Sequence, residues 1–173
     1  MSPLSPEYTF KFTTSIAEIN KEVWDTLADG HGPFCQYSFL HALETSESVG
    51  GNSGWLSFHL AIYQNSETVG ILPLYQKTHS YGEYVFDFAW ANAYHQHGLD
   101  YYPKLVAAIP FTPVTSAKLM LSDKVDRQQL LPILCQHINQ QLTLSGMSSM
   151  NWLFVTKDIS DLLNTQGQLQ RHS

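Results

Sequence analysis

The sequence is poor in charge and has no cluster of basic residues. Charged residues make up 14% of its 173 residues, and the formal net charge at pH 7 is −6. Proteins that bind nucleic acid or anionic membranes carry clustered Lys and Arg side chains, because these neutralise phosphate groups. The composition therefore argues against DNA as a partner and against electrostatic attachment to a membrane.

Long apolar runs and a targeting segment are missing too. No stretch approaches the roughly 20 apolar residues needed to span a bilayer. The first ten residues, MSPLSPEYTF, lack the basic and apolar regions of a secretion signal. We therefore expect a cytoplasmic protein without a membrane span. The chain has only two cysteines, Cys35 and Cys135, and in this setting free thiols are expected rather than a disulfide.

Apolar residues, by contrast, are plentiful. They make up 43% of the chain, which is enough to build the core of one domain over residues 1–173. Their periodicity predicts an ordered core over 8–156, followed by a short helix and a polar tail over 157–173. Predicted strands cover 8–13, 55–63, 68–78, 84–90, a split segment within 105–121, and 150–156; predicted helices cover 16–28, a segment from Ser38, 126–144 and 158–164.

This order of elements predicts an α/β (α+β) fold, in which a mixed, largely antiparallel sheet carries helices on its faces. Prolines predict where the sheet is interrupted. Pro73 removes a ladder hydrogen bond, so a bulge or an edge is expected near it, and Pro110 and Pro113 cannot both lie in one continuous strand.

The most unusual stretch runs from Lys77 to Thr115, where aromatic rings alternate with titratable side chains. Amphipathic rings interleaved with acids and bases are typical of the wall of a binding cleft. An aromatic hairpin that simply packs is the alternative. The candidate substrate-binding residues are Tyr81, Tyr84, Trp90, Tyr101, Tyr102 and Lys104, with Phe86 and Phe88 expected on the same side of the strand as Tyr84 and Trp90.

Three residues of this stretch could transfer protons. Glu83 and His79 are the candidates closest to the ring face, and Asp87 is expected on the opposite face of the predicted strand, where burial would raise its pKa. The alternative is that each carboxylate forms an ion pair with Lys77 or Lys104. The pattern His95-x-His97 with Asp100 could offer metal ligands, but so short a motif is weak, and no metal site is expected.

Three blocks of sequence resemble a known bacterial family. They are the region around Pro33-Phe34 and Ser38 to Glu44, the block from Leu72 to Asp87 that contains HSYGEYVFD, and the block from Tyr101 to Val114 that contains YYPK and PFTPVT. They resemble the FemAB-like proteins, a family of GNAT-like acyltransferases labelled as acting in peptidoglycan biosynthesis or recognition. The resemblance extends over nearly the whole chain.

The resemblance implies a GNAT-type lobe that transfers an acyl or aminoacyl group to an amine, with a peptidoglycan precursor as a possible acceptor. The implied donor is acyl-CoA or an aminoacyl-tRNA. Family members have two lobes, and this chain resembles the N-terminal lobe, with the second lobe absent. Strand 150–156 is then expected at an uncovered, C-terminal edge of the sheet, where it could pair with another chain and cause self-association.

The sequence lacks a glycine-rich loop of the Q/R-x-x-G-x-G/A type, which would bind the pyrophosphate of CoA through backbone N–H groups at a helix start. The cofactor is therefore unknown, and two other functions stay open. The chain could be a non-catalytic module that binds a cell-wall precursor or peptide, or an inactive truncated fragment.

Overall fold

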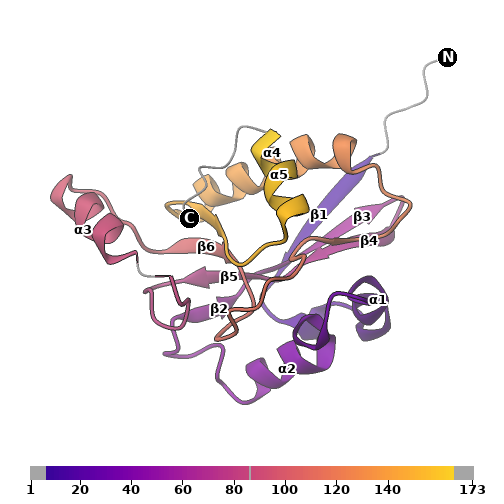
Figure 1. Cartoon of the computed structure of the whole chain (residues 1–173), viewed down its shortest axis with the longest axis horizontal. Coiled ribbons are helices and arrows are strands. Elements are labelled where there is room, and N and C mark those ends of the chain that lie inside the picture. Colours follow the sequence, from indigo (N-terminus) through magenta and orange to yellow (C-terminus); the bar gives the residue numbers. More distant parts are fainter. Residues whose placement is uncertain (1–6, 86, 166–173) are drawn as a thin grey trace.

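The computed structural model describes residues 7–85 and 87–165. This part of the chain forms mixed, mostly antiparallel sheets and five α-helices (Figure 1), which confirms the predicted fold class. The strands are β1 Tyr8–Thr13, β2 Trp55–Ser57, β3 His59–Gln64, β4 Glu67–Leu72, β5 Leu74–Lys77, β6 Lys104–Ala107, β7 Met120–Leu121 and β8 Met150–Trp152. The helices are α1 Lys21–Leu27, α2 Tyr37–Thr45, α3 Phe88–Gln96, α4 Arg127–Leu144 and α5 Lys157–Thr165.

The strands form two four-stranded sheets, in the orders β1-β3-β4-β7 and β2-β5-β6-β8, and not the single sheet that the sequence predicts. Each of the predicted strands 55–63 and 68–78 contributes to both sheets, because it is interrupted at Phe58 or at Pro73. The interruption at Pro73 confirms the predicted loss of a ladder bond. The Phe58 N–H still donates to the Leu74 carbonyl at 2.9 Å, so the two sheets stay joined.

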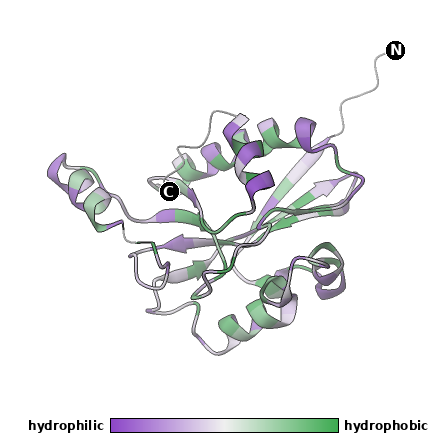
Figure 2. Ribbon diagram, in the orientation of Figure 1, coloured by the Kyte–Doolittle hydropathy of each residue, from purple (hydrophilic) through white to green (hydrophobic). Residues whose placement is uncertain are grey.

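Helices cover both sides of the sheets, as predicted. In Figure 1, α1 and α2 lie below the strands, and α4 and α5 lie above them. One core cluster packs α4 and α5 against residues such as Leu60 and Leu105, and a second packs α1 and α2 around Ile71 and the fully buried Trp24. Figure 2 shows hydrophobic stretches in the central strands, with hydrophilic residues at some strand ends, and outer helices that alternate between the two kinds.

The predicted helices over 126–144 and 158–164 are confirmed as α4 and α5. The predicted helix 16–28 is instead a 3₁₀ turn, Ile16–Glu18, followed by α1. A separate helix, α1, begins after this turn because Asn20 is its N-cap. The Asn20 side chain accepts a hydrogen bond from the Val23 N–H at 3.0 Å. Helix α2 starts at Tyr37, one residue before the predicted cap, Ser38.

The predicted strand over 84–90 is wrong. Tyr84 has a positive φ of 58°, and the chain then enters α3, so the expected alternation of Tyr84, Phe88 and Trp90 along one strand does not occur. Phe86 lies outside the described residues. The segment FAWANA alternates rings with alanine, which has the highest helix propensity, and no neighbouring strand among the described ones supplies a ladder of hydrogen bonds. Helix α3 has no buried residue and projects from the body (Figure 1).

The predicted split within 105–121 is confirmed. Strand β6 ends at Ala107, an irregular segment containing Pro110 and Pro113 follows, and β7 starts at Met120. Strand β8 pairs with β6 in parallel and is shorter than the predicted 150–156. Beyond it, Ser116 and Val155 form an isolated parallel bridge, and the buried Lys118 ammonium donates to the Phe154 carbonyl at 3.1 Å.

Two further expectations concern the chain as a whole. Cys35 and Cys135 are both free and buried, which confirms the predicted thiols. Within residues 7–85 and 87–165, no helix has the length and apolar character that crossing a membrane requires.

Candidate functional site

Two lysines lie opposite each other in neighbouring strands. Lys77 ends β5, Lys104 starts β6, and the antiparallel register pairs them directly. Both are buried, with 0% and 1% of their surface exposed. Like charges placed opposite each other destabilise a sheet, and a buried ammonium is costly without a counter-ion. The sheet therefore requires negative charge at this position.

Glu83 and Asp87 supply that charge from the segment between β5 and α3. The Lys104 ammonium lies 2.8 Å from Glu83 Oε2 and 2.5 Å from Asp87 Oδ2, and the Tyr102 hydroxyl donates to Asp87 Oδ1 at 3.0 Å. Lys104 also lies over the rings of Tyr101 and Tyr102, 5.3 and 5.6 Å from their centres. The ion pairs expected as the alternative role of these carboxylates are thus present with Lys104.

The two carboxylates differ in their proton affinity. Burial raises the pKa of Glu83 above its ordinary value, although the ion pair with Lys104 opposes this. Burial also favours a higher pKa for Asp87, but the hydrogen bonds and charge of Lys104, helped by Tyr101 and Tyr102, hold it below its ordinary value. The predicted rise in the pKa of Asp87 is therefore wrong, because Asp87 has more partners than the sequence reveals.

Glu83 is 2% exposed, and its Oε1 atom has no hydrogen-bond partner among the described residues. Its other oxygen is held by Lys104, so the carboxylate is fixed in place, and Oε1 is buried without a hydrogen bond from the described residues. A carboxylate with a raised pKa and a free lone pair is suited to accept a proton from a bound group. Asp87, which bonds through both oxygens, is suited to hold Lys104 and Tyr102 in place.

Lys77 has different contacts from those of Lys104. Its ammonium donates to the Tyr81 carbonyl at 2.9 Å and lies 4.1 Å from the centre of the Trp55 ring. Burial and the neighbouring charge of Lys104 lower the pKa of Lys77 to about 8, although Glu83 opposes this. The Trp55 ring in turn packs against Phe111, with ring centres 5.7 Å apart.

His79 lies at the edge of this cluster. Its ring packs so tightly against Gly54 that a Cβ at position 54 would come within 2.1 Å of it. The Nδ1 atom is buried and has no hydrogen-bond partner within residues 7–85 and 87–165, and burial together with the charge of Lys77 lowers the pKa of His79. A neutral imidazole is thus favoured at this position.

The structure divides the candidate substrate-binding residues into two groups. Tyr101, Tyr102 and Lys104 come together with the two carboxylates. The side chains of Tyr81, Tyr84 and Trp90 are 71, 58 and 51% exposed, and Trp90 belongs to the projecting helix α3. The strand that would have aligned these rings is absent, so they do not form the predicted continuous face.

Sequence reasoning missed Lys77, Trp55 and Phe111 as members of this site. The sequence predicts Lys77 only as an ion-pair partner, and Trp55 lies outside the stretch from Lys77 to Thr115. A signal for Lys77 is present in the sequence, since LPLYQK and KLVAAI are otherwise apolar strand segments that each carry a lysine at one end. Their direct opposition depends on strand register, which only the folded structure shows.

The start of α4 is a candidate pyrophosphate site only if a glycine-rich loop precedes it and its backbone N–H groups are free. The loop before it, residues 122–126, contains no glycine, and Asp126 Oδ1 accepts the N–H groups of Gln128 and Gln129 at 2.9 and 3.3 Å. The backbone donors that would bind phosphate therefore already bond to a carboxylate of the chain itself. This helix start does not fit a CoA pyrophosphate.

The histidine motif stays apart from the carboxylates. His95 and His97 are exposed at the end of α3, and His97 Nδ1 lies 2.7 Å from the Ala93 carbonyl of its own helix. Over residues 7–85 and 87–165, no three His, Cys, Asp or Glu side chains are grouped closely enough to hold a metal ion.

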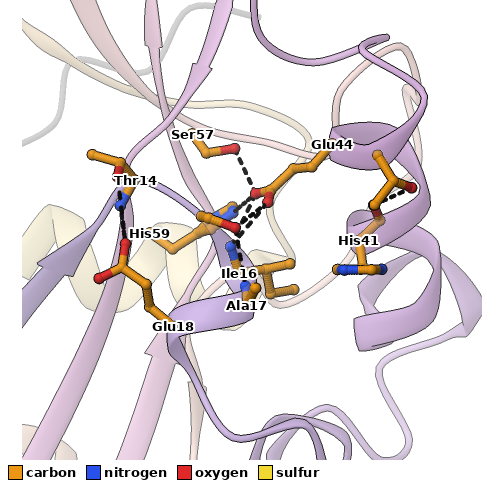
Figure 3. A network of polar contacts seen from close by, with 10 residues as sticks. Thr14, Ile16, Ala17, Glu18, His41, Glu44, Ser57 and His59 are labelled. Atoms are coloured by element: carbon orange, nitrogen blue, oxygen red, sulfur yellow. Dashed lines mark hydrogen bonds and ion pairs between the residues drawn. The ribbon is translucent and has the colours of Figure 1, made fainter.

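A second buried polar network surrounds Glu44 of α2 (Figure 3). Its carboxylate accepts hydrogen bonds from the Ser15 hydroxyl at 2.7 Å, the Ile16 N–H at 3.0 Å and the Ser57 hydroxyl at 2.6 Å, and it lies 3.0 Å from His59 Nε2. Although burial opposes ionisation, these bonds lower the pKa of Glu44 to about 2. Because both oxygens of Glu44 are fully used, this network fixes α2 to the strands, and the carboxylate of Glu44 is not free to act as a base.

Comparison with known families identifies the chain. Residues 15–173 match the FemAB-like family, described as acting in peptidoglycan biosynthesis or recognition. The chain belongs to this family. No curated protein matches the FemAB-like chain.

Solved acetyltransferases share the fold of this FemAB-like chain. A ribosomal-protein-alanine N-acetyltransferase from Brucella melitensis biovar Abortus 2308 superposes with a TM-score of 0.52 at 8% identity, covering 96% of this chain and 92% of its own. A probable acetyltransferase gives 0.53 at 12% identity, with coverages of 96 and 91%. The aminoglycoside acetyltransferase meta-AAC0020 from an uncultured soil sample, solved with trehalose, gives 0.52 at 14%, also with 96 and 91%. At these identities the likeness establishes the GNAT-like fold.

Proposed function

We propose that this FemAB-like chain is an N-acyltransferase lobe that transfers an acyl or aminoacyl group to an amine. The observation that carries the proposal is Glu83, a carboxylate 2% exposed whose Oε1 has no partner in the described part of the chain and whose pKa is raised by burial. Membership of the FemAB-like family and the GNAT-like fold support the same reaction class. The family description makes a peptidoglycan precursor the first acceptor to test.

The chemistry requires a base because an ammonium group has no lone pair with which to attack. Glu83 Oε1 accepts a proton from the bound ammonium, and the free amine nitrogen then forms a bond to the acyl carbonyl carbon. The bond from that carbon to the donor's oxygen or sulfur breaks, and the second proton lost by the nitrogen passes to this leaving atom. Lys104 holds Glu83 Oε2 at 2.8 Å and keeps Oε1 oriented, while Asp87 and Tyr102 position Lys104.

His79 is the second candidate for proton transfer. Its pKa is lowered, so the imidazole is neutral near pH 7 and its buried Nδ1 can accept or donate depending on the tautomer. Among the described residues, the one charge that acts on the pKa of His79 is the ammonium of Lys77, which disfavours the imidazolium form. His79 could receive the proton that Glu83 removes.

One observation favours a non-catalytic binding module. The start of α4 is capped by Asp126, so this lobe offers no helix terminus there for the pyrophosphate of acyl-CoA. A module of this kind would bind the amine at Glu83 and leave transfer to another part of an assembly. An aminoacyl-tRNA donor does not require that pyrophosphate site.

The test compares Glu83→Gln with the wild-type chain, using labelled acetyl-CoA and an aminoacyl-tRNA as donors and a panel of amines as acceptors. Loss of a general base should lower transfer about a hundredfold, with an unchanged circular dichroism spectrum. Glu67→Gln is the matched control, since Glu67 is exposed and lies 3.8 Å from Lys124 at the surface. Unchanged transfer by Glu83→Gln would remove Glu83 from the mechanism. Amine binding without transfer from either donor would favour the binding module.

A further inference from the structure

Helix α3 has little packing that would keep it folded in water. It spans nine residues, Phe88–Gln96, and none of their side chains is buried. Its N-cap, Asp87, makes no capping bond, because its carboxylate bonds to Lys104 and Tyr102. Isolated helices shorter than about 12 residues are marginal in water, and most helices in proteins are stabilised by burying an apolar face. Figure 1 shows α3 projecting away from the other helices, so a surface beyond the described residues is needed to cover it.

Large apolar side chains are exposed on this helix and next to it. Phe88 and Trp90 are each 51% exposed, and Tyr84 and Leu99 in the flanking segments are 58 and 59% exposed. With 3.6 residues per turn, side chains two positions apart point about 160° apart, so Phe88 and Trp90 lie on nearly opposite sides of α3. The groove of a protein partner covers one side of a helix, whereas a lipid interface surrounds a helix that enters it.

The charge of this stretch fits a bilayer of neutral lipids. No Asp, Glu, Lys or Arg occurs from Phe88 to Leu99, so insertion takes no permanently charged side chain out of water. Asp87, at the start of the helix, is already paired with Lys104. The net charge of −6 opposes binding to anionic lipids, which attract basic segments. Trp, Tyr and Phe favour the zone between the lipid headgroups and the acyl chains, because their rings are apolar with a polar edge in Trp and Tyr.

We propose that α3 is an interfacial anchor, which places the rings of Phe88 and Trp90 at the boundary between headgroups and acyl chains of a zwitterionic bilayer. The helix lies in this boundary and does not span the membrane, since a span takes about 20 residues. Because Asp87 joins the start of α3 to Lys104 and Tyr102, the anchor holds the carboxylate cluster close to the lipid surface. The anchor does not depend on the proposed acyl transfer.

Sedimentation of the full chain with sucrose-loaded phosphatidylcholine vesicles measures the partition constant. The wild-type chain should bind, and Phe88→Ala/Trp90→Ala should lower the partition constant at least about tenfold, the factor expected for burying a single large apolar side chain. Alanine favours a helix, so α3 should be retained. The matched control is Ile133→Ala/Leu144→Ala, which removes two side chains of α4 that are 40 and 81% exposed, and it should leave the partition constant unchanged.

A second variant keeps both rings and changes the charge. Asn92→Glu adds a carboxylate at an exposed position of α3, and it should also weaken binding because that charge would leave water on insertion. In the wild-type chain, brominated phosphatidylcholine should quench the fluorescence of Trp90, whereas Trp24 and Trp55 are buried in the protein.

Absence of wild-type binding to phosphatidylcholine overturns the proposal, as does equal binding by the wild-type chain and Phe88→Ala/Trp90→Ala. Binding confined to vesicles of equal parts phosphatidylcholine and phosphatidylglycerol overturns it too, because attachment would then be electrostatic. If Phe88→Ala/Trp90→Ala abolishes self-association of a chain that does not bind vesicles, α3 contacts a second copy of the chain and not a lipid surface.

Discussion

At the scale of single residues, the number of hydrogen-bond partners decides in which direction the pKa of a buried carboxylate shifts. Glu44, Glu83 and Asp87 are all carboxylates in largely buried positions, yet the pKa of Glu83 is raised while those of Glu44 and Asp87 are lowered. Glu44 has four hydrogen-bond partners and Asp87 bonds through both oxygens, whereas Glu83 bonds through one. The open oxygen is what separates a candidate base from two structural acids.

The lowered pKa of Glu44 makes a prediction about acid stability. A folded pKa of about 2, below the ordinary 4.5, means that ionised Glu44 stabilises the fold fully above pH 4.5. This contribution is lost as the pH falls from 4.5 towards 2, and its upper limit is about 3 kcal/mol. We expect Glu44→Gln to lower the free energy of unfolding at pH 7 by about 1–3 kcal/mol and to flatten its dependence on pH in that window.

Urea unfolding followed at several pH values measures this effect. Glu22→Gln is a suitable control because Glu22 is exposed on α1. An equal pH dependence in Glu44→Gln and the wild-type chain would show that the Ser15, Ser57 and His59 contacts do not stabilise the ionised carboxylate.

At the scale of secondary-structure elements, caps and interruptions decide where the helices and strands lie. Asn20 separates α1 from the preceding 3₁₀ turn, and Pro73 divides one hairpin arm between two sheets. Asp126 starts α4 through its bonds to Gln128 and Gln129. These are local effects, and the amino-acid sequence reveals most of them.

Removing the Asp126 cap should change two properties independently: the stability of the fold and the ability of the start of α4 to bind CoA. Asp126→Ala should lower the free energy of unfolding by about 1 kcal/mol, the usual cost of losing an N-cap. It should also free two backbone donors at the start of α4. Thermal unfolding with and without CoA tests both points, with Asp123→Ala in the same loop as the control.

If wild-type protein is unaffected by CoA while Asp126→Ala is stabilised by it, the carboxylate is what keeps phosphate from α4. A wild-type chain already stabilised by CoA would contradict the conclusion that this helix start does not fit the pyrophosphate.

At the scale of the whole molecule, the two sheets and their helices place the lysine and carboxylate cluster where β5 and β6 meet the irregular segment before α3. The cluster therefore combines Lys77 and Lys104, which are 27 residues apart in the sequence, with side chains from the segment that connects them. One edge of the same sheet is formed by β8, which pairs with β6. Among the described strands, β8 has β6 as its one sheet neighbour.

That edge carries the prediction of self-association. The segment from Leu144 to Thr156 contains no charged residue, and charges are a common protection of exposed edge strands. We expect the chain to associate on concentration, and Asn151→Lys to increase the monomer fraction by placing a charge on the edge. Light scattering over a concentration series measures this.

Gln136→Lys on the exposed side of α4 adds the same charge elsewhere and should leave association unchanged. A wild-type chain that stays monomeric at high concentration would show that the edge of β8 is protected by other means.

The sequence predicted most of the fold because much of it follows from local patterns. Apolar spacing located α4 and α5, and the prolines marked the breaks at Pro73, Pro110 and Pro113. The same approach failed at residues 84–90, where alternation of rings and small residues suits a strand but alanine also favours a helix. Without a neighbouring strand to pair with, the helix prevailed.

By itself, the amino-acid sequence determined the fold class, the free cysteines, and the stretch that contains Glu83, Asp87 and Lys104, because periodicity, composition and motif lie along the chain. Only the tertiary structure decided that Lys77 faces Lys104, that Asp87 has every oxygen bonded, and that Glu83 keeps one open. The physical reason is that strand register and burial bring together residues distant in sequence, and those neighbours set the proton affinity of each carboxylate.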